Sequence, residues 1–250
     1  MTRGTPNDAQ SLYNAACKDM ESGLYPEAIK ELGDVKTKYP YSKFATLAEL
    51  RIADTYYKRA TYIEAIDSYK SFLKLHPNHP DSPYAMFRIG EAYSEQAPSD
   101  WFILPPAAEK DQADTRLAIT AYRELIARYP DDEMTKQARE RLALQRRKLA
   151  DHELYVASFY FKRDYFQAAA ARAEGLLHDY AGVGTDVPAL LIAARSYAAL
   201  GHFDLVRTTL ERLIREFPGD DEAKKARIEI ESLGVGKPTA SQPAEAGRQG

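Results

Sequence analysis

The histidines are the side chains most able to bind a metal, and their spacing does not favour a metal site. His152-Glu153 begins like the His-Glu-x-x-His zinc motif, but Val156 stands where the second histidine would be. His76 and His79 are three residues apart with Pro77 between them, so we interpret them as loop residues rather than as a pair of ligands. The sequence therefore predicts no metal centre.

Cys17 is the only cysteine, which excludes a disulfide within the chain and a cysteine-based zinc site. Beside Lys18 its thiol could have a lowered pKa, but we favour a small core residue on the first helix. We interpret His178-Asp179 as a solvated helix end. The phosphate-binding pattern GxxxxGK[ST], the dinucleotide pattern GxGxxG and the nucleophile pattern GxSxG do not occur. We expect no catalytic activity, no catalytic residues and no cofactor.

The composition adds two exclusions. A net charge of −3 and a pI near 6.0 argue against nucleic-acid binding, which usually requires a basic surface. The chain has no run of about 18 apolar residues, the length expected of a membrane-spanning helix. It does contain 17 tyrosines, which suit surfaces that are partly core and partly binding face.

Five copies of one pattern run along the chain. Each copy ends in an aromatic residue or histidine followed by proline, or in one copy by alanine. The endings are Tyr39-Pro40, His76-Pro77, Tyr129-Pro130, Tyr180-Ala181 and Phe217-Pro218. Twelve residues before the last residue of each ending stands a small or β-branched apolar residue: Ala28, Ala65, Ala118, Ala169 or Val206. A second set precedes these: Ala16, Ala53, Gly90, Ala157 and Ala194.

This pattern predicts pairs of antiparallel helices. Small residues let two helix axes approach closely, and a proline ends the second helix of each pair. Gly23 and Gly201 stand where the turn within a pair needs a positive φ. The spacing of 37 from Pro40 to Pro77 is slightly longer than the ~34 of tetratricopeptide repeats. We predict an all-α, tetratricopeptide-type solenoid of five helix pairs plus a C-terminal capping helix from about 220 to 232.

Two interruptions of the period predict the domain organisation. The distance from Pro77 to Pro130 is 53, or 16 more than 37, and we place the insertion at 97–113. From residue 131 no glycine or proline occurs until after Arg163, which predicts one long linking helix. We therefore expect repeats 1–3 in residues 8–130, the long helix with repeats 4–5 and the cap in 131–232, and a disordered tail in 233–250.

The aromatic residues supply candidate contacts with other polypeptides. Adjacent aromatics such as Tyr56-Tyr57 and Phe159-Tyr160 cannot all face one core stripe, so we expect some of them to contact a partner. Trp101 and Phe102 lie in the proline-flanked insertion, which must pack back on the repeats or meet a partner; we favour packing back. The basic residues of the long helix could attract an anionic partner, but we favour a solvated face. These basic residues are Arg139, Arg141, Arg146, Arg147 and Lys148.

The chain resembles the BamD family, the tetratricopeptide lipoproteins of the outer-membrane β-barrel assembly (BAM) machinery. The resemblance covers roughly Leu12 to Ala226. It rests on Tyr39-Pro40-Tyr41-Ser42, on Phe72-Leu73 through His76-Pro77-Asn78-His79-Pro80, on Asp111-Gln112-Ala113-Asp114, on Arg141 to Ala157 with Tyr160 and Arg163, and on Ala171-Arg172-Ala173-Glu174-Gly175. The insertion and the long helix also stand where that family has them.

The resemblance implies partners and a location. It implies that the C-terminal repeats bind the periplasmic domain of a BamA-like barrel protein, with Arg172 at the contact and Arg163 and Glu174 in the matching motifs. It also implies that the N-terminal repeats receive segments of unfolded outer-membrane proteins, with Tyr39, Phe159 and Tyr160 at matching aromatic positions. Attachment of other accessory lipoproteins stays open.

The implied location is the periplasm, tethered to the inner leaflet of the outer membrane through a lipidated N-terminal cysteine. Residues 1–6 lack the apolar region of a signal peptide, and Cys17 has no lipobox before it. Either the anchor precedes this sequence or this member lacks one. The family has a tyrosine pair where this chain has Phe159-Tyr160, and a proline where it has Ala181.

Other classes stay open at this point. A second periplasmic tetratricopeptide adaptor, of the cell-division coordination type, would share repeats ending in Tyr-Pro but would have a regular array. An enzyme that uses the repeats as a scaffold would need a catalytic motif. A cytosolic co-chaperone would carry a repeated Lys/Arg clamp.

Overall fold

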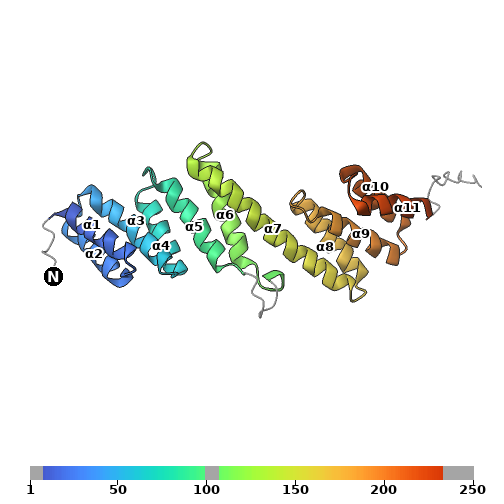
Figure 1. Cartoon of the computed structure of the whole chain (residues 1–250), viewed down its shortest axis with the longest axis horizontal. Helices are drawn as coiled ribbons and strands as arrows, with labels where there is room; N and C mark the ends of the chain where they lie inside the picture. Colours follow the sequence, from blue (N-terminus) through green and yellow to red (C-terminus); the bar gives the residue numbers. More distant parts are fainter. Residues whose placement is uncertain (1–7, 99–106, 233–250) are drawn as a thin grey trace, which may run out of the picture. The chain divides into compact units, whose positions relative to one another are not determined.

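The computed structural model describes residues 8–98 and 107–232, and within them every regular element is helical (Figure 1). The helices are α1 (Ala9–Glu21), α2 (Tyr25–Lys38), α3 (Lys43–Lys58), α4 (Tyr62–Leu75), α5 (Ser82–Gln96), η1 (Ala107–Glu109), α6 (Ala113–Arg128), α7 (Glu133–Phe161), α8 (Phe166–Asp179), α9 (Asp186–Ala199), α10 (Phe203–Glu216) and α11 (Asp221–Ser232). Five pairs, from α1–α2 to α9–α10, precede the capping helix α11. The predicted fold class is confirmed.

The small residues that define the repeat are the points of closest helix packing. Apart from Gly90, nine residues define the pattern. Eight of the nine have no exposed surface, and Ala194 is 3% exposed. The eight are Ala16, Ala28, Ala53, Ala65, Ala118, Ala157, Ala169 and Val206. Since a small side chain lets the facing helix approach, each pair closes at these positions, and larger residues one turn away fill the space beside them.

The turn inside a pair repeats the same backbone geometry. Gly23 and Gly201 have φ of +79° and +75°, as the sequence predicts, and the equivalent position is held by Ala60 and Asp164, each with φ of +62°. In each case the next residue donates its N–H to a carbonyl five residues earlier, as Thr61 does to Tyr56 at 3.0 Å. This bond satisfies a carbonyl at the end of the first helix and fixes the entry into the second.

The chain divides into two compact units, residues 1–149 and 150–250. The division falls inside α7, whereas the sequence places it at residue 131, before this helix. The physical reason is that the two halves of α7 belong to different cores. Ala138 and Leu142 pack with residues of α5 and α6. Leu154 and Ala157 pack with residues of α8, α9 and α10.

The described part of the insertion is ordered by one glutamine. Gln112 is 3% exposed, and its amide nitrogen donates to the carbonyls of Ala107 and Lys110 at 2.8 and 2.9 Å. Its amide oxygen accepts a hydrogen bond from the hydroxyl of Thr115 at 3.0 Å. The residues from η1 to the first turn of α6 are therefore tied together. Trp101, Phe102 and the predicted disordered tail 233–250 lie outside the described residues.

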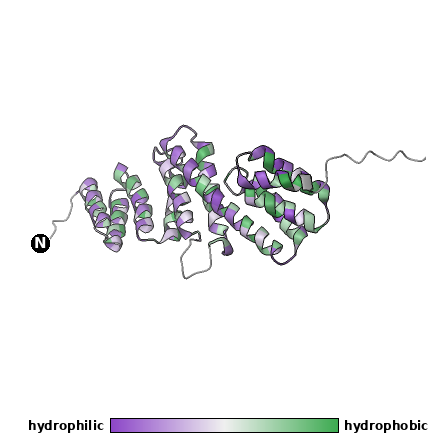
Figure 2. Ribbon diagram, turned by 45° about the vertical axis from the view of Figure 1, so that its right-hand side comes forward, coloured by the Kyte–Doolittle hydropathy of each residue, from purple (hydrophilic) through white to green (hydrophobic). Residues whose placement is uncertain are grey.

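Hydrophobic and hydrophilic residues are interspersed along the helices (Figure 2), as expected of amphipathic helices that bury one face. Within residues 8–98 and 107–232, none of the helices combines the length and the hydropathy needed to cross a membrane.

Gly90 explains why one repeat departs from the alanine pattern. A Cβ at this position would lie 2.5 Å from Cε1 of Tyr122, a side chain with no exposed surface. The large ring on α6 therefore needs a residue without a side chain on α5.

We expect Gly90→Ala to lower the free energy of unfolding by about 1–3 kcal/mol, because the ring of Tyr122 sits in a filled core and must shift. Gly33→Ala is the matched control: a Cβ there meets nothing within 4 Å, so the helix gains up to about 1 kcal/mol. Urea unfolding followed by circular dichroism measures both. A Gly90→Ala variant as stable as the parent would contradict this packing account.

Candidate partner-binding surfaces

A buried carboxylate ties together the helices of the first repeats. Asp54 on α3 is 4% exposed, and its Oδ1 accepts hydrogen bonds from Tyr69 of α4 at 2.6 Å and from Tyr84 of α5 at 2.9 Å. Its Oδ2 accepts from the guanidinium of Arg51. Arg51 also donates from Nε to the hydroxyl of Tyr13 on α1 at 3.2 Å. Because all of these polar atoms are paired, the network fixes the side chains of four helices relative to one another.

Beside this network lies Arg88, which forms no ion pair with a carboxylate of residues 8–98 or 107–232. The guanidinium carbon of Arg88, on α5, is 3.6 Å from the ring centroid of Tyr57 on α3. Tyr57 also meets Tyr62 edge-on, with ring centroids 5.4 Å apart. The Nε of Arg88 is buried without a hydrogen-bond partner among the described residues. We define Tyr57, Tyr62 and Arg88 as the first-unit aromatic surface, which offers ring faces for stacking and a cation that can donate to carbonyl or carboxylate oxygens.

The sequence predicts Tyr56, Tyr57 and Tyr39 as contacts, and the structure separates them. Tyr56 and Tyr57 both pack, partly buried, against the core around Tyr69 and Phe72, and Tyr57 in addition contacts Arg88 and Tyr62. Tyr39 follows α2 and packs against the core of the first repeat. Arg88 is absent from the sequence prediction because a single arginine on α5 becomes distinctive only when packing brings it onto Tyr57.

A charged hollow of about 500 Å³ lies between α5 and the first half of α7. Glu91 at its floor pairs with Arg141 at 3.1 Å and accepts a hydrogen bond from the hydroxyl of Tyr122 at 2.7 Å. Gln145 donates from its amide to Ser94 at 3.1 Å. Arg141 is therefore already paired within the chain, which fits the preferred interpretation of the basic residues on this helix as surface charge.

In the second unit, three residues predicted from the sequence do come together. The guanidinium carbon of Arg163 is 3.6 Å from the ring centroid of Phe159, whose side chain is 38% exposed. Tyr160 contacts Phe159 and Tyr165 edge-on, with centroids 5.8 and 6.3 Å apart. Tyr165 is 61% exposed and is a contact candidate that the sequence analysis did not include.

Arg172 and Glu174 lie on α8 but have different partners. Arg172 forms an ion pair with Glu153 of α7 at 3.1 Å, with half of its side chain exposed. Glu174 accepts a hydrogen bond from the hydroxyl of Tyr197 on α9. The pKa of Tyr197 is raised by burial and by this carboxylate. Residues two apart on a helix point in different directions, so the two side chains serve separate surfaces.

The remaining reactive side chains carry no site. Among the residues that the structure describes, no three of His, Cys, Asp and Glu gather closely enough to hold a metal ion. His76 meets Glu49 through Nε2 at 2.8 Å. Burial raises the pKa of the Cys17 thiol, which opposes the alternative of a reactive thiolate.

The family model for YfiO, described as outer membrane lipoprotein, matches residues 5–213. This match covers the first four repeats, extends into both units and ends within α10, the last helix of the fifth repeat. The chain belongs to the YfiO/BamD family.

Individual relatives agree with this assignment. Outer membrane protein assembly factor BamD of Neisseria meningitidis serogroup A is 28% identical over 217 residues, which cover 84% of this chain and 79% of that protein. The BamD proteins of Caulobacter vibrioides and Vibrio cholerae are 26% and 24% identical, covering 84% and 79% of this chain and 66% and 83% of their own lengths.

Two solved structures of tetratricopeptide proteins align with this chain over most of its length. A tetratricopeptide repeat protein from Parabacteroides merdae gives a TM-score of 0.41 at 17% identity, covering 90% of this chain and 73% of its own. The TPR2AB domain of yeast Sti1, titled as a complex with pHSP90, gives a TM-score of 0.45 at 14% identity, covering 90% of this chain and 85% of its own.

The Asp54 network predicts how stability responds to high pH. Burial and the charge of Asp54 raise the pKa of Tyr84 to about 12 from an ordinary value of 10.0, and they raise the pKa of Tyr69 as well. The unfolded chain loses these protons from pH 10 upward while the folded chain keeps them, so stability falls between about pH 10 and 12. The slope is about 1.4 kcal/mol per pH unit for each proton.

We expect Tyr84→Phe to show a shallower loss of stability over that pH range, since one of the retained protons is gone. Tyr41→Phe, at a fully exposed tyrosine between α2 and α3 outside the network, is the control and should keep the parent slope. Urea unfolding at pH 9 to 12 measures the slopes; equal slopes for parent and Tyr84→Phe would refute this assignment.

Proposed function

We propose that this chain is an assembly factor for outer-membrane β-barrel proteins and acts by holding other polypeptides. The family match over both units carries the proposal, because the relatives it resembles bear that role in their names. The surfaces described above consist of aromatic rings and charged side chains, which are suited to contacts with other proteins. In this proposal the chain works at the periplasmic face of the outer membrane, anchored to the inner leaflet in its full-length form.

The second unit is proposed to bind the periplasmic domain of a BamA-like barrel protein. Arg172 supports this contact because half of its side chain remains exposed although it is paired with Glu153. A guanidinium has five N–H donors, so it can donate to one carboxylate within the chain and to a second carboxylate of a partner. The cluster of Phe159, Tyr160 and Arg163, in the same unit, supplies an exposed aromatic face and a second cation.

The first unit is proposed to bind extended segments of unfolded barrel proteins. An extended segment displays backbone carbonyls and, in barrel strands, alternating aromatic side chains. The first-unit aromatic surface offers the partly exposed guanidinium of Arg88 to the carbonyls and two tyrosine rings to the side chains. The Asp54 network behind it limits the entropy lost on binding, since its side chains are already fixed.

We expect Arg172→Glu to weaken binding of the BamA periplasmic domain from the same organism at least about tenfold, the effect of losing roughly 1.4 kcal/mol at a charged contact. The double variant Glu153→Arg/Arg172→Glu restores the ion pair within the chain with its charges exchanged. If Arg172 contacts the partner, the double variant stays weak in a surface-plasmon assay. Full recovery in the double variant would show that Arg172 acts through Glu153, and unchanged binding by Arg172→Glu would refute the contact.

We expect Tyr57→Ala and Arg88→Gln each to weaken binding of a fluorescent strand peptide from an outer-membrane barrel protein by about three- to tenfold, because each removes a stacking or cation–π contact. Fluorescence anisotropy gives the affinities. Tyr165→Ala, which removes an exposed ring in the other unit, is the control. Equal effects of Tyr57→Ala and Tyr165→Ala would count against a strand site in the first unit.

A further inference from the structure

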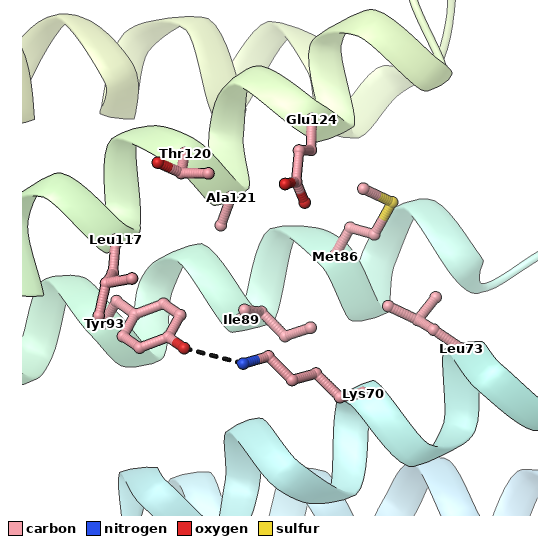
Figure 3. Close-up of a pocket in the computed structure, with 9 residues that line it drawn as sticks. All are labelled: Lys70, Leu73, Met86, Ile89, Tyr93, Leu117, Thr120, Ala121 and Glu124. Atoms are coloured by element: carbon pink, nitrogen blue, oxygen red, sulfur yellow. Dashed lines mark hydrogen bonds between the residues drawn. The ribbon is translucent and has the colours of Figure 1, made fainter.

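The first unit carries an apolar groove that the proposed function does not use. Its volume is about 290 Å³, room for one or two apolar side chains, and it lies where α4 and α6 pack on either side of α5 (Figure 3). The apolar lining is Leu73 of α4, Met86 and Ile89 of α5, and Leu117 of α6. Lys70 on α4 and Glu124 on α6 stand on opposite sides of the groove (Figure 3). Among the described residues neither forms an ion pair.

The second unit has a groove built from the same repeat positions. It has a volume of about 250 Å³ and lies on α8, α9 and α10. Leu73 and Tyr93 correspond to Leu177 and Tyr197, 104 residues later, and Leu117 and Thr120 correspond to Leu205 and Thr208, 88 residues later. Leu117 and Leu205 are each 45% exposed, so both grooves leave the same apolar side chain open to solvent.

The charges on the two sides of these grooves are exchanged. In the first groove Lys70 donates to the hydroxyl of Tyr93 at 2.9 Å. In the second, the position of Lys70 holds Glu174, which accepts from the hydroxyl of Tyr197. On the opposite side Glu124 is replaced by Arg212, which also pairs with Glu216 at 3.0 Å, and Glu211 and Arg215 line the same side. The groove therefore exists twice, with the charges exchanged at these two matched positions.

The repeat alone does not impose such a groove. Between the first two repeats, the positions of Leu73 and Met86 hold Lys36 and Glu49, which form an ion pair at 3.3 Å. The position of Leu117 holds Glu64. The helices at this boundary occupy the same repeat positions, but charged side chains replace the apolar lining. An apolar lining at two of the repeat boundaries is thus a property of these side chains, and an exposed apolar lining is typical of a binding site.

The charge pattern selects the form of the occupant. A bound segment must present an apolar side toward the floor, an acid toward Lys70 and a base toward Glu124. An extended strand displays only two faces, whereas a helix can place an apolar stripe between an acidic flank and a basic flank. We propose that each groove binds an amphipathic helix of a partner protein, with an apolar stripe flanked by acidic residues on one side and basic residues on the other.

One helix of this kind fits both grooves. Turning it end over end keeps the apolar stripe on the floor and exchanges its flanks. The bound helix runs in one direction relative to α5 in the first unit and in the reverse direction relative to α9 in the second. The exchanged charges thus set the direction in which the partner helix lies, a known use of charge in helix pairing.

The test is the stoichiometry of a designed peptide of about 18 residues, with a leucine stripe, glutamates on one flank and lysines on the other, measured by calorimetry with the full chain. We expect two sites in the parent chain, one site in Leu117→Ser, one in Leu205→Ser and none in the double variant. Both leucines are nearly half exposed, so the variants should fold. Thr120→Arg and Thr208→Arg block the same grooves without removing apolar surface and should give the same stoichiometries.

Peptides whose two flanks carry the same charge test whether binding requires one acidic and one basic flank. Peptides with two acidic or two basic flanks should bind at least about tenfold more weakly, since one flank then faces a like charge. Absence of binding by the mixed peptide, two sites in the double variant, or equal affinity for all three peptides would overturn the proposal. The assay contains no BamA-like protein and no barrel substrate, so its outcome is independent of the function proposed above.

Discussion

Close approach of helices through small residues is the constraint on which the rest of the structure depends. No single helix pair can bury its apolar face alone, so each must pack on the next, and the distance between them is set by side chains such as Ala53 and Ala157 that have no exposed surface. Where one partner is the large Tyr122, the opposing residue must be Gly90. Because this packing requires only one stripe of each helix, the other faces are free to differ between repeats.

Those free faces carry polar groups in two distinct ways. Asp54 is buried, and its three donors are two tyrosines of neighbouring helices and Arg51 of its own helix, so its charge serves to fix side chains. Arg88 and Arg172 are partly exposed: Arg88 stacks on Tyr57, and Arg172 pairs with Glu153. In the first unit the Asp54 network lies beside Tyr57 and Arg88 and holds its side chains fixed, an arrangement that limits the entropy a binding surface there would lose.

The two units use one repeat framework for different surfaces. In the first, Arg88 of α5 lies against Tyr57 of α3; in the second, Arg163, in the turn after α7, lies against Phe159 near the end of that helix. The apolar grooves share their positions but exchange their charges at Lys70 and Glu174. Repeats that share a packing stripe but differ in their outward residues thus place grooves at matching positions with different charges.

The sequence by itself determined the features that depend on near neighbours in the chain. The helix pairs, the positive φ at Gly23 and the uninterrupted α7 follow from small residues, prolines and glycines at fixed spacing, because these act on the local backbone. Only the tertiary structure decided which side chains of different helices meet. Arg88 lies 31 residues from Tyr57 and Arg172 lies 19 from Glu153, yet each pair is in contact. The division of α7 at residue 149 likewise depends on which core each half packs against.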